Sequence, residues 1–146
     1  MNEPIGGVET GIRTAIPYLI VKGATEAIDW YRDVFGAIPV LRMAGADGRI
    51  GHAEITIGAS TLYIADERPE MEGIVGPRTL GGSSVMIDLE VDDVETLFQA
   101  ALVAGATAIR QVDHPTAGVQ SAKVVDPFGH IWLMTRVIED ARDTTS

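Results

Sequence analysis

An internal repeat constrains the fold of this chain more than any other feature of the sequence. The pattern of Ile16 to Ala37 returns at Met86 to Ala106: a short apolar run, a helical pattern of apolar residues, and a Gly-Ala pair. The two Gly-Ala pairs lie 69 residues apart, and residues 60–65 match 130–135 at an offset of 70. Because these features recur in the same order, the chain is predicted to be a duplication of one structural unit.

Each copy begins with a pattern typical of a strand followed by a helix. In the first copy, Ile16 to Val21 is apolar and β-branched, and a helical pattern begins at Ala24. In the second copy, Val85 to Val91 is the predicted strand, and Asp92 is expected to cap the helix with Glu95 three residues on. A glycine is expected to end each helix, since it adopts the left-handed conformation at little steric cost.

Three further strands are predicted after each helix. They cover 39–43, 51–57 and 61–65 in the first copy and 107–112, 119–125 and 131–137 in the second. The sequence Asp126 to Gly129 is typical of a tight turn, and Asp126 and His130 are expected to hold this turn by hydrogen bonds. The predicted fold class is therefore α+β, with paired βαβββ modules whose curved sheets surround a cavity.

The order of domains follows from these patterns and from local composition. We expect a flexible N-terminal arm at 1–13, a first module at 14–66, a connector loop at 67–82, a second module at 83–138 and a frayed tail at 139–146. The connector is rich in Gly, Pro and acidic residues, which is typical of an exposed loop, and a lid over a site is the alternative interpretation.

Composition excludes several classes of function. A net charge of −10 argues against nucleic acid or an anionic membrane as partner, because both would repel the chain. The absence of cysteine excludes disulfides, a thiolate nucleophile and Cys-ligated zinc. Since no basic leader and no apolar stretch of about 20 residues is present, we expect a cytoplasmic protein.

The alternation of residues along the strands assigns a face to each side chain. The side predicted to lie against the helices contains Leu19, Val21, Leu62, Ile64, Val85, Ile87, Leu89, Trp132 and Met134. The opposite, inner side contains Ile16, Tyr18, Ile20, His52, Glu54, Thr56, Thr61, Tyr63, Ala65, Met86, Asp88, Ile131, Leu133 and Thr135. A mostly apolar face with a few polar groups is typical of a pocket for a small molecule.

Four runs of the sequence resemble a known family. PYLIVKGATEAIDWYRDVFGA, GRIGHAEITIG, STLYIADE and DPFGHIWLMTRVIED are similar to the PhnB-like branch of the glyoxalase, bleomycin-resistance and extradiol-dioxygenase superfamily, the vicinal oxygen chelate proteins. The resemblance covers roughly residues 14–140 and implies paired βαβββ modules and a homodimer. It implies less about activity, because that superfamily contains metal-dependent lyases, isomerases and dioxygenases beside metal-free proteins that bind drugs.

The resemblance also places the metal ligands of the metal-dependent members. Their four inward positions fall here on Ile16, Tyr63, Met86 and Leu133. None of these is a usual ligand of a divalent metal, which prefers imidazole and carboxylate groups. We therefore expect no metal and no cofactor at these positions.

Three hypotheses of function remain open. The leading one is a metal-free homodimer that binds a small, partly apolar molecule. Its expected ligand contacts are Ile16, Tyr18, Tyr63, Met86, Asp88 and Leu133. The alternative is a glyoxalase-like lyase or isomerase with His52 and Glu54 as catalytic residues, joined by Asp88, although a structural role of this pair in its hairpin is the simpler interpretation. The third is a protein-interaction module whose cavity is filled by side chains.

Overall fold

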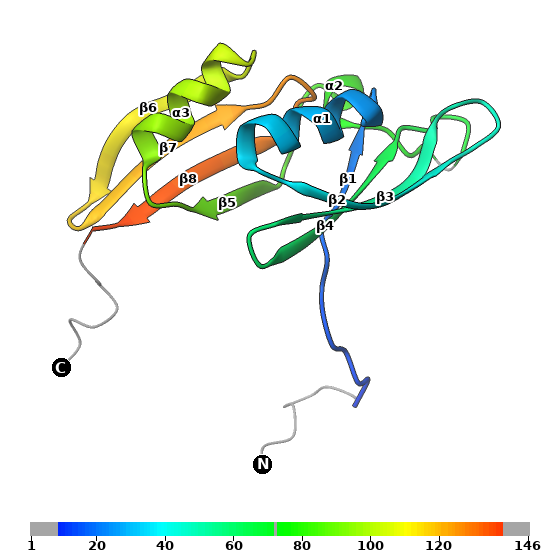
Figure 1. Cartoon of the computed structure of the whole chain (residues 1–146), viewed down its shortest axis with the longest axis horizontal. Coiled ribbons are helices and arrows are strands. Elements are labelled where there is room, and N and C mark those ends of the chain that lie inside the picture. The colour runs from blue at the N-terminus through cyan, green and yellow to red at the C-terminus, as the bar shows by residue number, and fades with distance from the viewer. Residues whose placement is uncertain (1–8, 72, 139–146) are drawn as a thin grey trace.

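The computed structural model describes residues 9–71 and 73–138 and contains eight strands and three helices (Figure 1). The first module comprises β1 (Tyr18–Val21), α1 (Ala24–Phe35), β2 (Ile38–Ala44), β3 (Ile50–Ile57) and β4 (Ser60–Asp66). The second comprises β5 (Met86–Glu90), α3 (Val94–Val103), β6 (Thr107–Thr116), β7 (Val119–Val125) and β8 (Ile131–Val137), and the short helix α2 (Pro77–Leu80) lies between the modules. Residues 1–8 of the arm predicted at 1–13, and the whole tail predicted at 139–146, lie outside the described residues; residues 9–13 are described, are exposed and belong to no helix or strand.

The two modules have the same topology. Each forms a four-stranded sheet, in the order β1-β4-β3-β2 and β5-β8-β7-β6. Tyr18 pairs with Tyr63 in the first sheet, and Asp88 pairs with Leu133 in the second, so the equivalent pairs are 70 residues apart. This register confirms the predicted duplication and the α+β fold of βαβββ modules.

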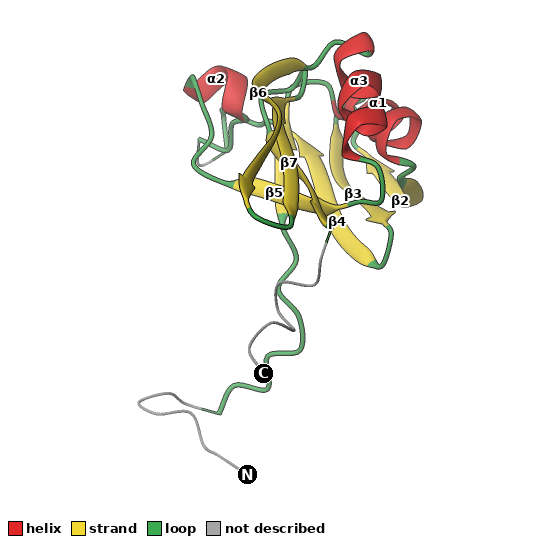
Figure 2. Ribbon diagram, turned by 90° about the vertical axis from the view of Figure 1, so that its left-hand side faces the viewer, coloured by secondary structure: helices red, strands yellow, loops and turns green. Residues whose placement is uncertain are grey.

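The helices of both modules lie on the same side of the sheets (Figures 1 and 2). The indole Nε1 of Trp30 on α1 donates a hydrogen bond of 2.8 Å to the carbonyl of Ala104, directly after α3. One core cluster includes fully buried side chains from both modules, among them Val21, Ile28, Tyr31, Ile64, Phe98, Val124, Trp132 and Met134. Because the two modules share this core, we expect them to fold as one cooperative unit.

The predicted turn at Asp126 to Gly129 is confirmed. Oδ1 of Asp126 accepts hydrogen bonds from the backbone N–H of Phe128 at 2.8 Å and of His130 at 3.0 Å. Gly129 has a φ of 95°, which a residue with a side chain rarely adopts. The imidazole Nε2 of His130 donates to the carbonyl of Ile20 at 2.9 Å, and the turn is thereby attached to the first module.

Two predicted element boundaries are wrong by one or two residues. The first strand begins at Tyr18 and not at Ile16, because Pro17 has no N–H to donate to a strand ladder. The second helix is capped by Asp93 and not by Asp92: Oδ1 of Asp93 accepts from the N–H of Thr96 at 3.0 Å. Both aspartates suit a cap, so composition alone does not choose between them.

Other differences concern the connector and the second sheet. Val85 was expected against the helices, but its side chain is 62% exposed, and the strand starts one residue later, at Met86. The connector is not only a loop, since it contains α2 with Pro77 at its first position. Strand β6 extends to Thr116 and carries irregularities in its register, whereas the sequence predicted an end at Val112.

The sheets do not enclose a cavity within one chain. The faces opposite the helices are open, and Tyr18 and Met86 are 46% and 52% exposed there. The expected chamber between two curved sheets is therefore absent from the single chain that the structure describes. Within residues 9–71 and 73–138, no helix is both long and apolar enough to span a membrane.

Candidate functional site

The open face of the first sheet carries a cluster of three rings, from Tyr18 on β1, His52 on β3 and Tyr63 on β4. The ring centroid of Tyr18 lies 5.4 Å from the centroid of His52 and also 5.4 Å from the centroid of Tyr63. The centroids of His52 and Tyr63 are 4.7 Å apart. All three contacts are edge-to-face, the geometry that aromatic quadrupoles favour. The cluster forms a rigid, largely apolar surface that is accessible from outside.

A hydrogen bond orients the imidazole within this cluster. The hydroxyl of Tyr18 lies 2.7 Å from Nδ1 of His52 and 3.3 Å from the carbonyl of Gly51. Partial burial and the neighbouring Tyr63 raise the pKa of Tyr18, so its hydroxyl stays protonated at neutral pH. Because Nδ1 of His52 is engaged by Tyr18, Nε2 is the ring nitrogen that remains for a ligand.

Glu54 lies on the same open face but does not pair with His52. It is directly opposite Tyr63 in the sheet, and His52 bonds with Tyr18 instead. Asp88, the third member of the alternative catalytic site, belongs to the other sheet, where its Oδ1 accepts from the hydroxyl of Thr135 at 2.7 Å. The structure therefore does not gather His52, Glu54 and Asp88 in one chain.

Two pockets adjoin the aromatic cluster. One has a volume of about 260 Å³, lies beside β1 and β4 and is bordered by Arg68 and Ile74 of the connector. The other has a volume of about 320 Å³ and lies between the modules, under the connector and beside His130. Tyr18 and Ile20 line both pockets, so β1 forms the wall between them.

The connector is held close to this wall. The backbone N–H of Gly76 donates to Oε1 of Glu67 at 3.0 Å, and the hydroxyl of Thr79 donates to the same oxygen at 2.7 Å. The Gly76 hydrogen bond, followed by that of Thr79, lowers the pKa of Glu67. A Cβ atom at Gly76 would lie only 2.7 Å from the carbonyl oxygen of Ile20, so only glycine permits this approach.

The four positions at which the family resemblance places metal ligands are related by the duplication. Ile16 and Met86 occupy the same place in the two modules, as do Tyr63 and Leu133, since each pair is 70 residues apart. Two aliphatic side chains, a thioether and a phenol engaged in ring packing offer no imidazole or carboxylate. Among the described residues, no three His, Asp or Glu side chains form a group that could hold a metal ion.

Sequence comparison identifies the class of protein that this fold represents. A family model for the glyoxalase/bleomycin resistance protein/dioxygenase superfamily matches residues 12–134. The chain therefore belongs to this superfamily.

Individual proteins are similar to this chain in sequence or in fold. An uncharacterized protein of Mycobacterium bovis is 38% identical over 126 residues, which cover 85% of this chain and 83% of that protein. The crystal structure of TioX from Micromonospora sp. ML1 is 26% identical, has a TM-score of 0.64 and is similar over 85% of this chain and 95% of TioX. A PhnB protein from Bacillus cereus is 16% identical with a TM-score of 0.64, over 85% of this chain and 99% of its own, and shares the fold.

Three residues with a part in the structure of the two sheets were missed by the sequence analysis. Asp66 accepts hydrogen bonds from the N–H groups of Gly23 at 3.0 Å, Ala24 at 2.8 Å and Ile50 at 2.7 Å, so it joins α1 to β3. Arg110 and Lys123 lie opposite one another on the second sheet. The alternation of β7 would have assigned Lys123 to the open face, but a bulge in β6 has no local signature in the sequence.

Proposed function

We propose that this protein binds a small, partly apolar organic molecule on the open faces of its sheets, without the four-ligand metal site of its metal-dependent relatives. The aromatic cluster of Tyr18, His52 and Tyr63 is the observation that carries the proposal, because a half-exposed cluster of rings beside two pockets offers apolar contact and a few polar groups together. Membership of the PhnB-like branch is part of the proposal and rests on the GHAE and DPFGH motifs.

The proposal includes a homodimer. Several large apolar side chains are exposed on the open faces and on the edge strand β2, where Ile38, Val40 and Met43 are 64%, 53% and 61% exposed. Such clustered apolar exposure is unusual for a monomer, and an edge strand of this kind favours association. A second copy would cover these side chains and complete a chamber over each open face.

A neutral fluorescent probe tests the binding function. We expect N-phenyl-1-naphthylamine to bind and gain fluorescence, and Tyr18→Ala to lower its affinity about tenfold, since a buried aromatic contact contributes roughly 1–1.5 kcal/mol. Val103→Ala, at a residue 88% exposed near the end of α3, is the control that should leave the affinity unchanged. Equal affinity of both variants for the probe would contradict the proposal.

Metal titration tests the second part of the proposal. Calorimetry with Mn²⁺, Ni²⁺ and Zn²⁺ is expected to detect no tight stoichiometric site. Tight binding of one metal ion by the wild-type protein that is lost in the Tyr63→Phe variant would contradict this part of the proposal.

A second candidate function is catalysis by His52 as general base, in a lyase or isomerase reaction. The 2.7 Å contact with Tyr18 favours it, because it fixes the orientation of the imidazole. In this case His52→Ala would abolish turnover of a glyoxalase-type substrate while the circular dichroism spectrum and the melting temperature stay close to those of the wild type. Unchanged turnover would exclude this role.

A further inference from the structure

We propose that the open face of the second sheet binds an oxyanion, a carboxylate or phosphate group, between Arg110 of β6 and Lys123 of β7. The proposal rests on the proposed binding function for the rest of the ligand, and it assigns the acidic end of that ligand to a defined pair of residues. The two residues are direct cross-strand partners in the register of the sheet.

The register of β6 places Arg110 opposite Lys123 through a bulge. Ala108 pairs with Val124 and Arg110 pairs with Lys123, so two steps along β6 correspond to one step along β7. Without this extra residue, Ile109 and not Arg110 would be opposite Lys123. Bulges of this kind redirect a side chain and occur frequently beside functional sites.

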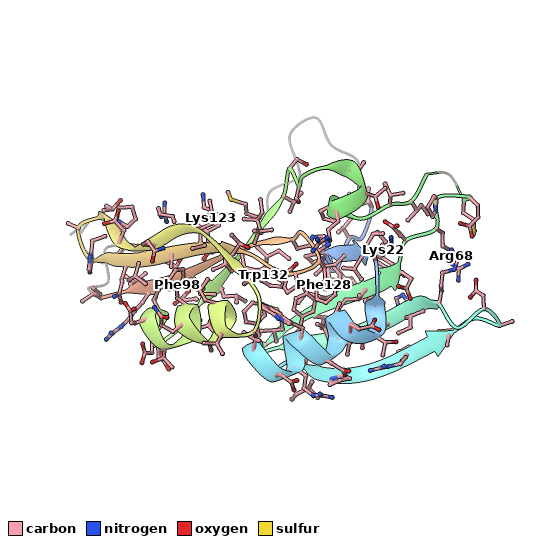
Figure 3. All side chains as sticks on the ribbon, turned by 90° about the horizontal axis from the view of Figure 1, so that it is seen from above. Lys22, Arg68, Phe98, Lys123, Phe128 and Trp132 are labelled. Carbon is pink, nitrogen blue, oxygen red and sulfur yellow. The ribbon has the colours of Figure 1, made fainter. Side chains whose placement is uncertain are left out.

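Lys123 projects from the open face. Figure 3 shows it on the side of the sheet away from α3, whereas Phe98 of α3 lies on the other side. This orientation agrees with the pairing of Lys123 with Leu133, since the flanking residues Ala122 and Val124 are completely buried against the helices. A ligand on the open face therefore has direct access to the ammonium group.

Two cations at this distance are unfavourable without an anion. Directly opposite residues of an antiparallel pair have Cα atoms about 4.5–5.5 Å apart, and like charges there destabilise the sheet. The ion pairs among the described residues involve Arg32, Arg49 and Arg68, and no carboxylate of residues 9–71 or 73–138 lies within 4.0 Å of the charged groups of Arg110 and Lys123. The pair is thus a concentration of positive charge in a chain whose net charge is −10.

The guanidinium is held in place by a buried hydroxyl. Nη2 of Arg110 donates to Oγ of Ser121, a residue only 3% exposed, and Nε of Arg110 is buried without a hydrogen-bond partner in the described part of the chain. A fixed guanidinium loses little entropy when it binds a carboxylate or phosphate. Ser121 therefore preorganises Arg110 for an anion.

Two acidic residues of the same sheet, Asp113 of β6 opposite Ser121 and Asp88 of β5, lie near the pair, and in the described part of the chain neither forms an ion pair with it. Asp88 pairs with Leu133, and Leu133 pairs with Lys123, so the backbones of Asp88 and Lys123 are two strand spacings apart, about 10 Å. Asp88 also accepts the hydrogen bond from Thr135. Leu133 between them provides an apolar surface, which suits a ligand with an acidic group next to an apolar body.

Titration of the intact protein with two probes, benzoate and inorganic phosphate, followed by NMR tests the inference. Both should shift the amide signals of Arg110, Ser121 and Lys123, and Lys123→Gln should weaken binding about tenfold, since a charge-assisted hydrogen bond contributes this much. Tighter binding of benzoate would assign the acidic group to an apolar carboxylate, and tighter binding of phosphate would assign it to a phosphorylated ligand.

The matched control is Arg136→Gln, which removes one positive charge from the opposite face of the same sheet. Equal losses of affinity in Lys123→Gln and Arg136→Gln, or shifts that avoid Arg110 and Lys123, would overturn the inference. In buffer without these anions, Lys123→Gln should melt at the same temperature as wild type or higher, because like-charge repulsion is removed. A lower melting temperature would assign Lys123 a structural role instead.

These outcomes separate the inference from the proposed function. N-phenyl-1-naphthylamine is uncharged and its binding depends on Tyr18, so its affinity should be the same in Lys123→Gln and in wild type. If the neutral probe binds but neither anion does, only the oxyanion site is wrong. If the anions bind at Arg110 and Lys123 but the neutral probe does not bind, only the apolar binding function is wrong.

Discussion

The hydroxyl of Tyr31 donates a hydrogen bond of 2.5 Å to Oδ2 of Asp126, 95 residues further along the chain. Tyr31 is on α1 of the first module, and Asp126 begins the turn between the last two strands of the second. The same carboxylate accepts from Nε1 of Trp132 at 2.8 Å and from two backbone N–H groups of the turn. Asp126 is only 3% exposed, and its carboxylate accepts hydrogen bonds from four donors, one of which belongs to the first module. It therefore joins the two modules.

Replacement of Asp126 by Ala should therefore destabilise the protein strongly. Buried donors would lose their acceptor, which costs about 3–5 kcal/mol of the free energy of unfolding in total. Urea denaturation monitored by tryptophan fluorescence measures this loss. Asp33→Ala, at an exposed carboxylate on α1, is the control and should change the stability by less than about 0.5 kcal/mol. A similar effect of both substitutions would show that Asp126 does not join the modules.

Stability at alkaline pH should depend on Tyr31. Burial, followed by the charge of Asp126, raises the pKa of Tyr31 well above that of an unfolded chain. Above pH 10 the unfolded state releases this proton while the folded state keeps it, so the stability present below pH 10 falls by up to about 1.4 kcal/mol per pH unit. Urea titrations between pH 9 and 11 should show a shallower slope for Tyr31→Phe, and identical slopes would contradict this account.

The sequence predicted the architecture because the duplication is visible in its periodicity. Alternation of apolar residues identified most strands, and glycines marked the helix ends. Sequence reasoning failed where three-dimensional packing decides between equivalent choices. Val94 is completely buried against the core, and its position selects Asp93 over Asp92 as the cap. The lack of closure of the sheets depends on how the modules pack, which no local pattern encodes.

The approach of the connector to β1 leads to a prediction for Gly76. Its φ of −87° would allow alanine, but the added Cβ would lie 2.7 Å from the carbonyl oxygen of Ile20 and 3.2 Å from Cα of Val21. Gly76→Ala should therefore move the connector away from β1 and cost about 1–3 kcal/mol of stability, as overpacking does. Urea denaturation measures the loss, and changed amide signals of Ile20 and Val21 would locate it.

Gly82→Ala is the matched control for this prediction. A Cβ at Gly82 would meet no atom within 4 Å, and Gly82 belongs to the same connector. Its replacement should change the free energy of unfolding by less than about 1 kcal/mol. If Gly76→Ala were as stable as Gly82→Ala, the close approach would not matter for stability.

The candidate site could be predicted only in part. Tyr18, His52 and Tyr63 were all expected on the inner face, since each side chain follows from the alternation of its own strand. The contact between Tyr18 and His52 could not be predicted, because their strands are not neighbours: β4 lies between β1 and β3, and the side chains meet across Tyr63. The bulge in β6 that places Arg110 opposite Lys123 could not be predicted from the sequence either.

The connector is also attached to the β2–β3 hairpin, which leads to a last prediction. Nη2 of Arg49 donates to Glu70 at 2.5 Å, and the hydrogen bond with Arg49 lowers the pKa of Glu70 to about 2. Any stabilisation from this ionised carboxylate is complete above its unfolded pKa of about 4.3 and is lost as the pH falls through about 2.

At neutral pH, Glu70→Gln should loosen the connector while the melting temperature changes little, because the pair is exposed. Hydrogen exchange measures this as a roughly two- to fivefold faster exchange of the amides of Arg68 and Ile74, compared with Glu90→Gln as control. Equal exchange rates in the two variants would mean that Arg49 does not hold the connector.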